Sequence, residues 1–145
     1  MIEKSQSYLK KRELKKREIE ALGDELLSDC REIVAKVHSN DFSSAKKLLN
    51  GSRSRLRKFL NITKAPNRFC DWGYILQVLQ EYLEASVLYM IIVGIDAGIL
   101  RLIEQFPEQS ILYGFSDLVG ELRRRVLTEL TKGNVEKARL YASVM

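Results

Sequence analysis

Hydrophobic positions recur along the 145-residue chain at spacings of three and four residues, the period of an amphipathic helix. No segment alternates apolar and polar residues for long enough to predict a β-strand. The pattern predicts about five helices, over residues 5–39, 42–62, 68–106, 110–131 and 135–145. Gly94 and Gly98 are candidate break points in the third helix, and Gly51 is a candidate kink in the second. The expected fold is all-α, a helical bundle formed by one domain over residues 1–145.

Two short polar segments mark the turns most clearly. Ser39-Asn40-Asp41 follows the first apolar stripe, and its aspartate is a good N-cap for the second helix. Lys132-Gly133-Asn134 follows the fourth helix, where a glycine is expected as a C-cap. Both segments therefore predict a helix end and an immediate restart.

Composition narrows the class of protein. Hydrophobic residues make up 46% of the chain and charged residues 30%, enough apolar material for a core. Two cysteines and one histidine exclude a disulfide framework and a four-cysteine zinc site. The longest apolar run, Ala85–Leu100, is interrupted by Asp96, so we expect a buried helix rather than a membrane span. With a charged N-terminus and no signal peptide, the expected location is cytoplasmic.

Charge is divided unevenly along the chain. Residues 1–68 hold 17 lysine and arginine residues against nine acids, whereas residues 69–121 hold eight acids and one arginine. A basic half favours a polyanionic partner such as nucleic acid, because lysine and arginine displace counterions from phosphates. The alternative is that these charges only line solvated helix faces.

Two pairs of acids lie where a core-forming helix is strongly apolar. Glu81 and Glu84 are three residues apart, and Asp117 and Glu121 are four apart, so each pair shares one helix face. Only Glu121 has basic residues one turn away, in Arg124 and Arg125. Like charges without local cations are unfavourable, and they become more so when partly buried. Each pair alone could be a solvated face, but two such pairs suggest that both face one shared site.

Four carboxylates at one site predict a hard divalent cation, and Mg²⁺ fits best because every donor is oxygen. A di-iron bundle would need two Glu-x-x-His motifs, and the single His38 belongs to neither segment. The sequence has no phosphate-binding glycine loop and no nucleophile elbow. Magnesium beside a basic half indicates phosphodiester chemistry, in which the metal activates water and polarises a phosphate oxygen.

These segments resemble the translin family. Leu112–Arg124 is similar to the family's Leu-x-Gly-x-x-Asp-Leu-x-Gly-Glu-Leu-x-Arg helix, and Gln80–Ala85 to a segment of the translin-associated factor X (Trax) branch. Arg31–Leu49 and Thr131–Ala138 are similar to the family's N-terminal helix and to its later turn. The resemblance covers nearly the whole chain, and the two acidic segments are its most specific parts.

The resemblance implies an all-α bundle that assembles into hollow oligomers binding single-stranded RNA or DNA. In the Trax branch the acids matching Glu81, Glu84, Asp117 and Glu121 form a magnesium-dependent endoribonuclease site. The translin branch lacks this set and chiefly binds nucleic acid. Because this chain has all four acids, the expected function is Mg²⁺-dependent endoribonuclease activity on single-stranded RNA, with the four acids as metal ligands and catalytic groups.

Family members usually carry a further helix after the turn that matches Gly133, whereas this chain stops at Met145. The resemblance implies a homo-oligomer, with a second translin-family subunit as an alternative partner. The candidate phosphate contacts are Arg53, Arg57, Lys64, Arg68 and Arg124. Two other functions stay open. One is a translin-like binder of single-stranded RNA or DNA that does not cleave it, and the other is a structural scaffold subunit.

Overall fold

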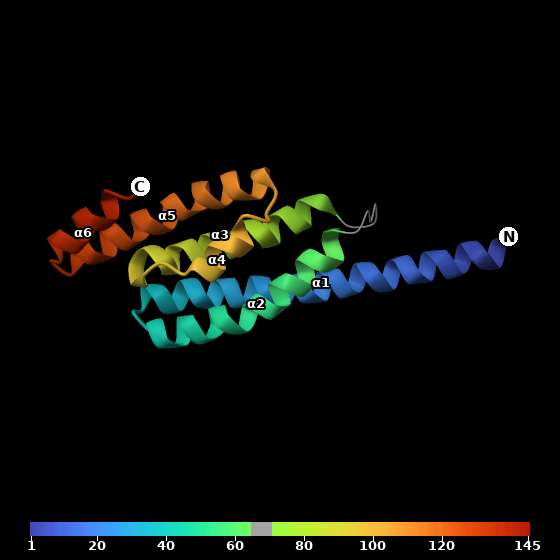
Figure 1. Cartoon of the computed structure of the whole chain (residues 1–145). Helices are drawn as coiled ribbons and strands as arrows, with labels where there is room; N and C mark the ends of the chain where they lie inside the picture. The colour runs from blue at the N-terminus through green and yellow to red at the C-terminus, as the bar shows by residue number, and fades with distance from the viewer. Residues whose placement is uncertain (65–70) are drawn as a thin grey trace.

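A computed structural model describes residues 1–64 and 71–145, and within them the chain forms helices without strands (Figure 1). The helices are α1 (Ile2–His38), α2 (Phe42–Lys64), α3 (Trp72–Val93), α4 (Ala97–Ile103), α5 (Glu108–Thr131) and α6 (Val135–Ala142). The all-α prediction is confirmed. The described part of the chain has six helices rather than about five.

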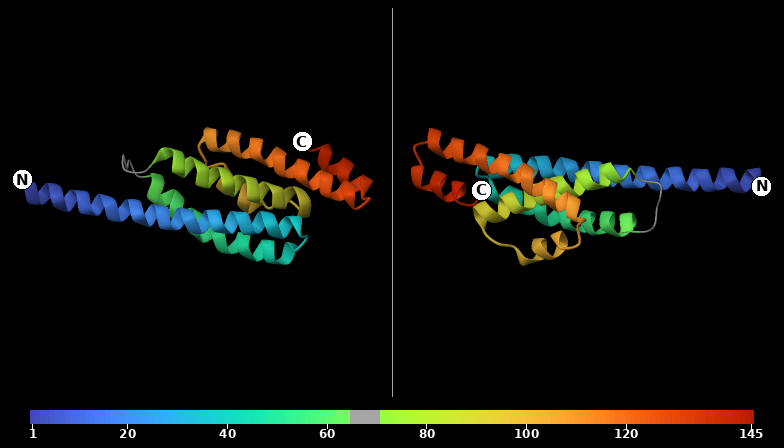
Figure 2. Two further views of the ribbon diagram at one scale, coloured as in Figure 1. Left: turned by 180° about the vertical axis from the view of Figure 1, so that it is seen from behind. Right: turned by 90° about the horizontal axis from the view of Figure 1, so that it is seen from above.

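The long α3 lies between two neighbours that are far apart in sequence. It packs against α1 on one side and α5 on the other, while α2 lies along α1 and the short α6 folds back on α5 (Figures 1 and 2). By length and composition alone α3 could cross a membrane, but 61% of its most apolar window is buried inside the bundle. That burial is typical of a core helix. The expected buried helix over Ala85–Leu100 is confirmed only for the part within α3, because the helix ends at Val93, and Ile95 and Leu100 are exposed.

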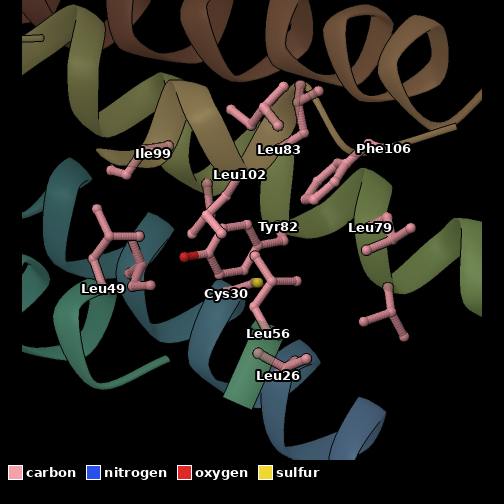
Figure 3. Packing of buried hydrophobic residues seen from close by; sticks show 14 of the residues in the cluster. Leu26, Cys30, Leu49, Leu56, Leu79, Tyr82, Leu83, Ile99, Leu102 and Phe106 are labelled. Atoms are coloured by element: carbon pink, nitrogen blue, oxygen red, sulfur yellow. The ribbon is translucent and has the colours of Figure 1, made fainter. Parts of the chain in front are cut away.

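The core forms where apolar stripes of α1, α2 and α3 meet. Tyr82 of α3 is fully buried at its centre, in edge-to-face contact with Phe106 at a centroid distance of 6.3 Å (Figure 3). Around it lie the buried side chains of Leu26, Cys30, Leu49, Leu56, Leu79, Leu83, Ile99 and Leu102. This packing fixes the rotation of α3 about its axis, and therefore the direction in which its acids point.

The predicted third helix is divided in two. α3 ends at Val93, where Gly94 adopts φ +143°, a conformation that L side chains rarely take. Asp96 then caps α4 by accepting hydrogen bonds from the backbone N–H groups of Gly98 and Ile99, and it pairs with Arg53 of α2. The break therefore lies at Gly94, the first of the two candidate glycines, and the predicted third helix is two helices.

The two predicted turns are confirmed. The backbone N–H of Ser44 donates to the Asp41 carboxylate, which caps α2, and Asn40 takes the left-handed φ of 62°. Gly133 has φ 78° and closes the end of α5. The helix α2 continues through Gly51 without interruption.

Close packing of α3 against α5 depends on Gly114. A β-carbon at this position would lie 2.8 Å from Leu83 Cδ2 and 3.0 Å from the Gln80 carbonyl oxygen, closer than such contacts allow. The missing side chain therefore lets the two backbones approach, one turn before Asp117 on α5 and beside Glu81 on α3.

Candidate carboxylate site

The four predicted acids come from the two helices that pack on one another. Glu81 and Glu84 project from α3 and are half-buried; on α5, Glu121 is half-buried and Asp117 is exposed. The contact at Gly114 places α5 against α3 along this stretch. The four acids therefore lie along one seam, the contact between α3 and α5.

The charges of the three other acids act on Glu84. The pKa of Glu84 is raised to about 7, first because the group is partly buried and then because Glu81, Glu121 and Asp117 repel its negative charge. The fields of Glu81 and Glu84 also reach the buried Cys30 on α1, whose pKa is raised mainly by burial. The seam is therefore an acidic site that extends inward from the surface.

Each acid of α5 already has a polar partner. Gln80 Nε2 donates to the carboxylate of Asp117, across the α3–α5 contact. His38 Nε2 lies 2.5 Å from Glu121 Oε2, and Arg124 Nη1 lies 3.7 Å from the same oxygen. An ionised carboxylate only accepts hydrogen bonds, so the His38 N–H donates to Glu121.

Arg125 fixes the position of His38. Its guanidinium is buried and donates to the carbonyl oxygens of Val37 and His38, each at 3.1 Å, and to Asn40 Oδ1 at 2.5 Å. A carboxylate oxygen of Glu129, equally buried, lies 3.1 Å from Arg125 Nη2. One buried cation thus ties the last turn of α1 to α5.

The same cluster reaches α6. Asn134, at the start of this helix, donates to the second oxygen of Glu129 at 2.8 Å. The ring of Tyr141 lies 5.7 Å from the Arg125 guanidinium carbon, within cation–π distance. The C-terminal helix is therefore connected, through Arg125, to the turn that carries His38.

Of the two arginines expected next to Glu121, only one lies close to it. Arg124 lies close to Glu121, whereas Arg125 turns away and pairs with Glu129. Arg125 is four residues after Glu121 and four before Glu129, so both pairings have helical spacing and sequence alone does not distinguish them. In the folded chain the buried Glu129 takes this arginine.

His38 is the neighbour that sequence reasoning missed. The sequence places His38 in neither acidic segment, yet its side chain contacts Glu121 directly. Its Nδ1 is buried and has no hydrogen-bond partner among the described residues. The two residues are 83 positions apart, and no local pattern could have joined them.

The donor chemistry of the site suits a hard divalent cation. Four carboxylates share one seam, and their repulsion, with burial, raises the pKa of Glu84. Among residues 1–64 and 71–145, however, no three Asp, Glu, His or Cys side chains are already grouped as metal ligands. Asp117 and Glu121 direct an oxygen to Gln80 and His38 instead, so gathering the four around one cation requires those two carboxylates to share or exchange partners.

The predicted phosphate contacts are distributed over more than one surface. Arg53 forms an ion pair with Asp96, which compensates its positive charge. Lys64 donates a hydrogen bond to Gln105 Oε1 at 3.2 Å. Arg57 is exposed on α2, and Arg124 is exposed beside Glu121. Arg68 lies outside the described residues. Of the four that the structure describes, Arg124 is the one that lies beside the acids.

Comparisons with known proteins agree with this architecture. No model of a known protein family matches the chain. Uncharacterized protein MJ0175 of Methanocaldococcus jannaschii is 29% identical over 140 residues, covering 96% of this chain. The chain spans 62% of the length of that curated relative.

Two solved structures share the fold. A chain of apo-NeC3PO superposes with a TM-score of 0.80 at 25% identity, over 94% of this chain and 74% of the other. A chain of an AfC3PO–duplex RNA complex gives 0.76 at 22% identity, over 99% of this chain and 73% of the other. The chain is thus an all-α protein with the helical fold of C3PO, the translin/Trax complex. Its similarities support a translin-like protein.

Proposed function

We propose that the chain is a Mg²⁺-dependent endoribonuclease that cleaves single-stranded RNA, with its site at Glu81, Glu84, Asp117 and Glu121, as in the Trax branch of the translin family. The observation that carries this proposal is the placement of all four acids on two helices packed against one another, α3 and α5. Burial and the three other acids raise the pKa of Glu84 to about 7, which agrees with this grouping. Keeping four carboxylates in one seam is unfavourable for folding, because their negative charges repel one another. A functional need for this charge would explain why the arrangement is kept. A divalent cation would compensate the charge.

When bound, the cation would polarise a phosphodiester oxygen and lower the pKa of an attacking water. The chain's own groups then have separate tasks. The four carboxylates would hold the cation, and one of them would accept a proton from the attacking water. His38 and Gln80 orient the carboxylates of Glu121 and Asp117 through their hydrogen bonds. Since protonation of Glu84 competes with cation binding, activity should increase from acidic to neutral pH.

RNA as the substrate is supported by the basic charges and by the relatives. Arg124 is exposed and lies 3.7 Å from Glu121, close enough to hold a phosphate next to the acids. Arg57 and Lys64 provide exposed positive charge on α2. One solved structure with the same fold is a complex with duplex RNA.

Assembly into a homo-oligomer is part of the proposal, with a second translin-family subunit as the alternative partner. The outward face of α5 is unusually apolar for a surface helix: Leu112, Phe115, Val119, Leu127 and Leu130 are each at least 40% exposed. Two exposed side chains, Val135 and Leu140, add to this surface on α6. We propose a cytoplasmic location.

A binding protein without nuclease activity is the second candidate. One observation favours it: Asp117 and Glu121 already have partners, and no three described acids, histidines or cysteines are grouped as ligands. In that case the acids are structural, and the protein binds single-stranded RNA or DNA without cutting it.

Cleavage of end-labelled single-stranded RNA distinguishes the two candidates. Wild-type protein should cut the RNA with Mg²⁺ and not with a chelator, and Asp117→Ala should abolish cutting while leaving RNA binding in place. The matched control is Glu108→Ala, an exposed acid in the first turn of the same helix, which should cut normally. Salt-sensitive binding without cleavage, in wild type as in Asp117→Ala, would establish the binding protein instead.

A further inference from the structure

The first half of α1 projects beyond the bundle. In both views of Figure 2 this part of the helix extends past the other helices and ends at the free N-terminus. Residues 1–18 are exposed except for the half-buried Lys15, and Ile19 is the first buried residue of the helix. We call residues 2–18 the arm. The arm is a helix of more than four turns with almost no core contact.

The arm is basic, and its charges are paired selectively. Residues 1–18 hold seven lysine and arginine residues against three glutamates. Arg17 pairs with Glu13, Lys16 with Glu20, and Glu18 with Lys58 of α2. No carboxylate among residues 1–64 and 71–145 lies within ion-pair distance of Lys10, nor of three further lysines, Lys4, Lys11 and Lys15.

These three lysines share one face of the helix. Lys4, Tyr8, Lys11 and Lys15 follow one another at spacings of four, three and four residues, so they form a single stripe. The next positions along this stripe are Ile19, Leu22 and Leu26, which are buried. The basic stripe therefore continues the core-facing side of α1, beyond the point where the core ends. The end of α2 that carries Lys64 lies at this same end of the bundle (Figure 1).

The stripe does not stabilise the arm. Lys11 and Lys15 are like charges four residues apart, a spacing that destabilises an isolated helix. Most of the stability of a helix in a protein comes from a packed apolar face, which the arm lacks. An anionic partner along the stripe would remove this repulsion and stabilise the helix.

We propose that the stripe of Lys4, Tyr8, Lys11 and Lys15 binds the phosphate backbone of RNA outside the carboxylate site, so that the arm is an extended grip for long substrates. This inference rests on the proposed RNA-cleaving function. Lys15 is 23 residues before His38, or about 35 Å along the helix axis. A stacked strand advances about 3.4 Å per nucleotide, so RNA must extend by about ten nucleotides to reach from the acids to the stripe.

Nucleic acid suits the stripe better than a protein helix does. A docking helix needs an apolar seam, and this face of the arm carries three lysines and one aromatic residue. Tyr8, the aromatic residue of this face, is 55% exposed and lies between Lys4 and Lys11 along the stripe. The chemistry is that of a sequence-independent grip.

The test compares two triple variants of equal charge in the full chain. The stripe variant is Lys4→Gln, Lys11→Gln and Lys15→Gln, and the control is Lys10→Gln, Lys16→Gln and Arg17→Gln. Glutamine keeps a high helix propensity. The control also removes two ion pairs within the helix, so it should weaken the arm more if helix formation were the only requirement. Binding is measured in chelator with single-stranded RNAs of about five and about twenty-five nucleotides, shorter and longer than the span.

We expect the stripe variant to bind the long RNA about tenfold more weakly than the control does. Its plot of log affinity against log salt concentration should have a slope that is smaller in magnitude by about two, as expected for lost phosphate contacts. Binding of the short RNA, and its cleavage in Mg²⁺, should be equal in the two variants. Equal affinity of both variants for the long RNA would overturn the inference while leaving the nuclease proposal intact. A change in oligomeric mass without a change in RNA affinity would overturn it too, and would assign the stripe to a second copy. Loss of long-RNA binding in a protein that never cleaves would support the grip and refute the nuclease.

Discussion

His38, on the last turn of α1, lies with its Nε2 2.5 Å from Oε2 of Glu121 on α5. The contact joins the first long helix to the candidate carboxylate site, across 83 residues of sequence. Its position is set from behind by Arg125, which holds the carbonyl oxygens of Val37 and His38. The site therefore depends on a buried ion pair that itself takes no part in the proposed chemistry.

Replacing Glu84 by glutamine should stabilise the protein near pH 8 and flatten its pH dependence. The pKa of Glu84 is about 7 in the folded chain, above its ordinary 4.5, so the folded state binds this proton more tightly than the unfolded state. The destabilising effect of Glu84 is therefore smallest below about pH 4.5, where the group is protonated in both states. Its contribution makes the free energy of unfolding decrease as pH rises toward 7. Urea unfolding of wild type and Glu84→Gln at about pH 5 and about pH 8 measures the difference.

The control for this measurement is Glu25→Gln, an exposed acid of α1. It should unfold like wild type at both values of pH. A Glu84→Gln protein that is less stable than wild type near pH 8 would contradict the repulsion on which the site is argued.

Two glycines of α5 give opposite predictions for the same substitution. Gly114→Ala should destabilise the fold by about 1–3 kcal/mol, because the new β-carbon would meet Leu83 and the backbone of Gln80. Gly120→Ala should stabilise it by about 0.5–1 kcal/mol, because nothing lies within 4 Å and alanine favours the helix. Chemical denaturation of both variants tests the close α3–α5 approach, and equal effects would argue against it.

Removing the Arg125 side chain should strongly destabilise the folded protein. Arg125→Met leaves the carboxylate of Glu129 buried without its cation, which costs about 3–5 kcal/mol. The double variant Arg125→Met, Glu129→Leu should recover much of that loss, because no buried charge is left unpaired. Thermal unfolding of the single and double variants measures this recovery. A double variant no more stable than Arg125→Met would show that the backbone contacts to α1, rather than the ion pair, carry the stability.

The thiol of Cys30 should be inert in the folded protein. It is 1% exposed, and burial together with the nearby Glu81, Asp29 and Glu84 raises its pKa, so little thiolate forms. In a Cys70→Ser background, a thiol-reactive dye near pH 8 should label Cys30 only at the rate of unfolding. Rapid labelling of the native protein would mean that the core between α1 and α3 opens.

Local sequence signals predicted the turns well and the third helix poorly. Asp41 and Gly133 act within a few residues of their own position, so the caps of α2 and α5 could be read directly. The apolar pattern, by contrast, runs on through Gly94, and periodicity alone does not show where α3 ends. The break is stabilised by a tertiary contact, the pairing of Asp96 with Arg53 on another helix.

The candidate site shows the same division. Spacing identified four acids on two helix faces, and their mutual effect on Glu84 agrees with that grouping. Their partners were not predictable, because His38 approaches Glu121 through the packing of distant helices. Arg125 had two partners at helical spacing, and burial rather than sequence selects Glu129. Charge composition likewise suggested phosphate contacts without showing that Arg53 is engaged by Asp96.

The central claim is that Glu81, Glu84, Asp117 and Glu121 form one divalent-cation site, and a titration with Mn²⁺ tests it most directly. Mn²⁺ prefers the same oxygen ligands as Mg²⁺ and can be followed by electron paramagnetic resonance. Without RNA in the sample, a contaminating nuclease cannot affect the result. We predict one bound Mn²⁺ per chain at neutral pH, displaced by Mg²⁺ and lost in Asp117→Asn, with Glu108→Gln binding as wild type does. Absence of saturable binding, or equal binding by Asp117→Asn, would contradict the account.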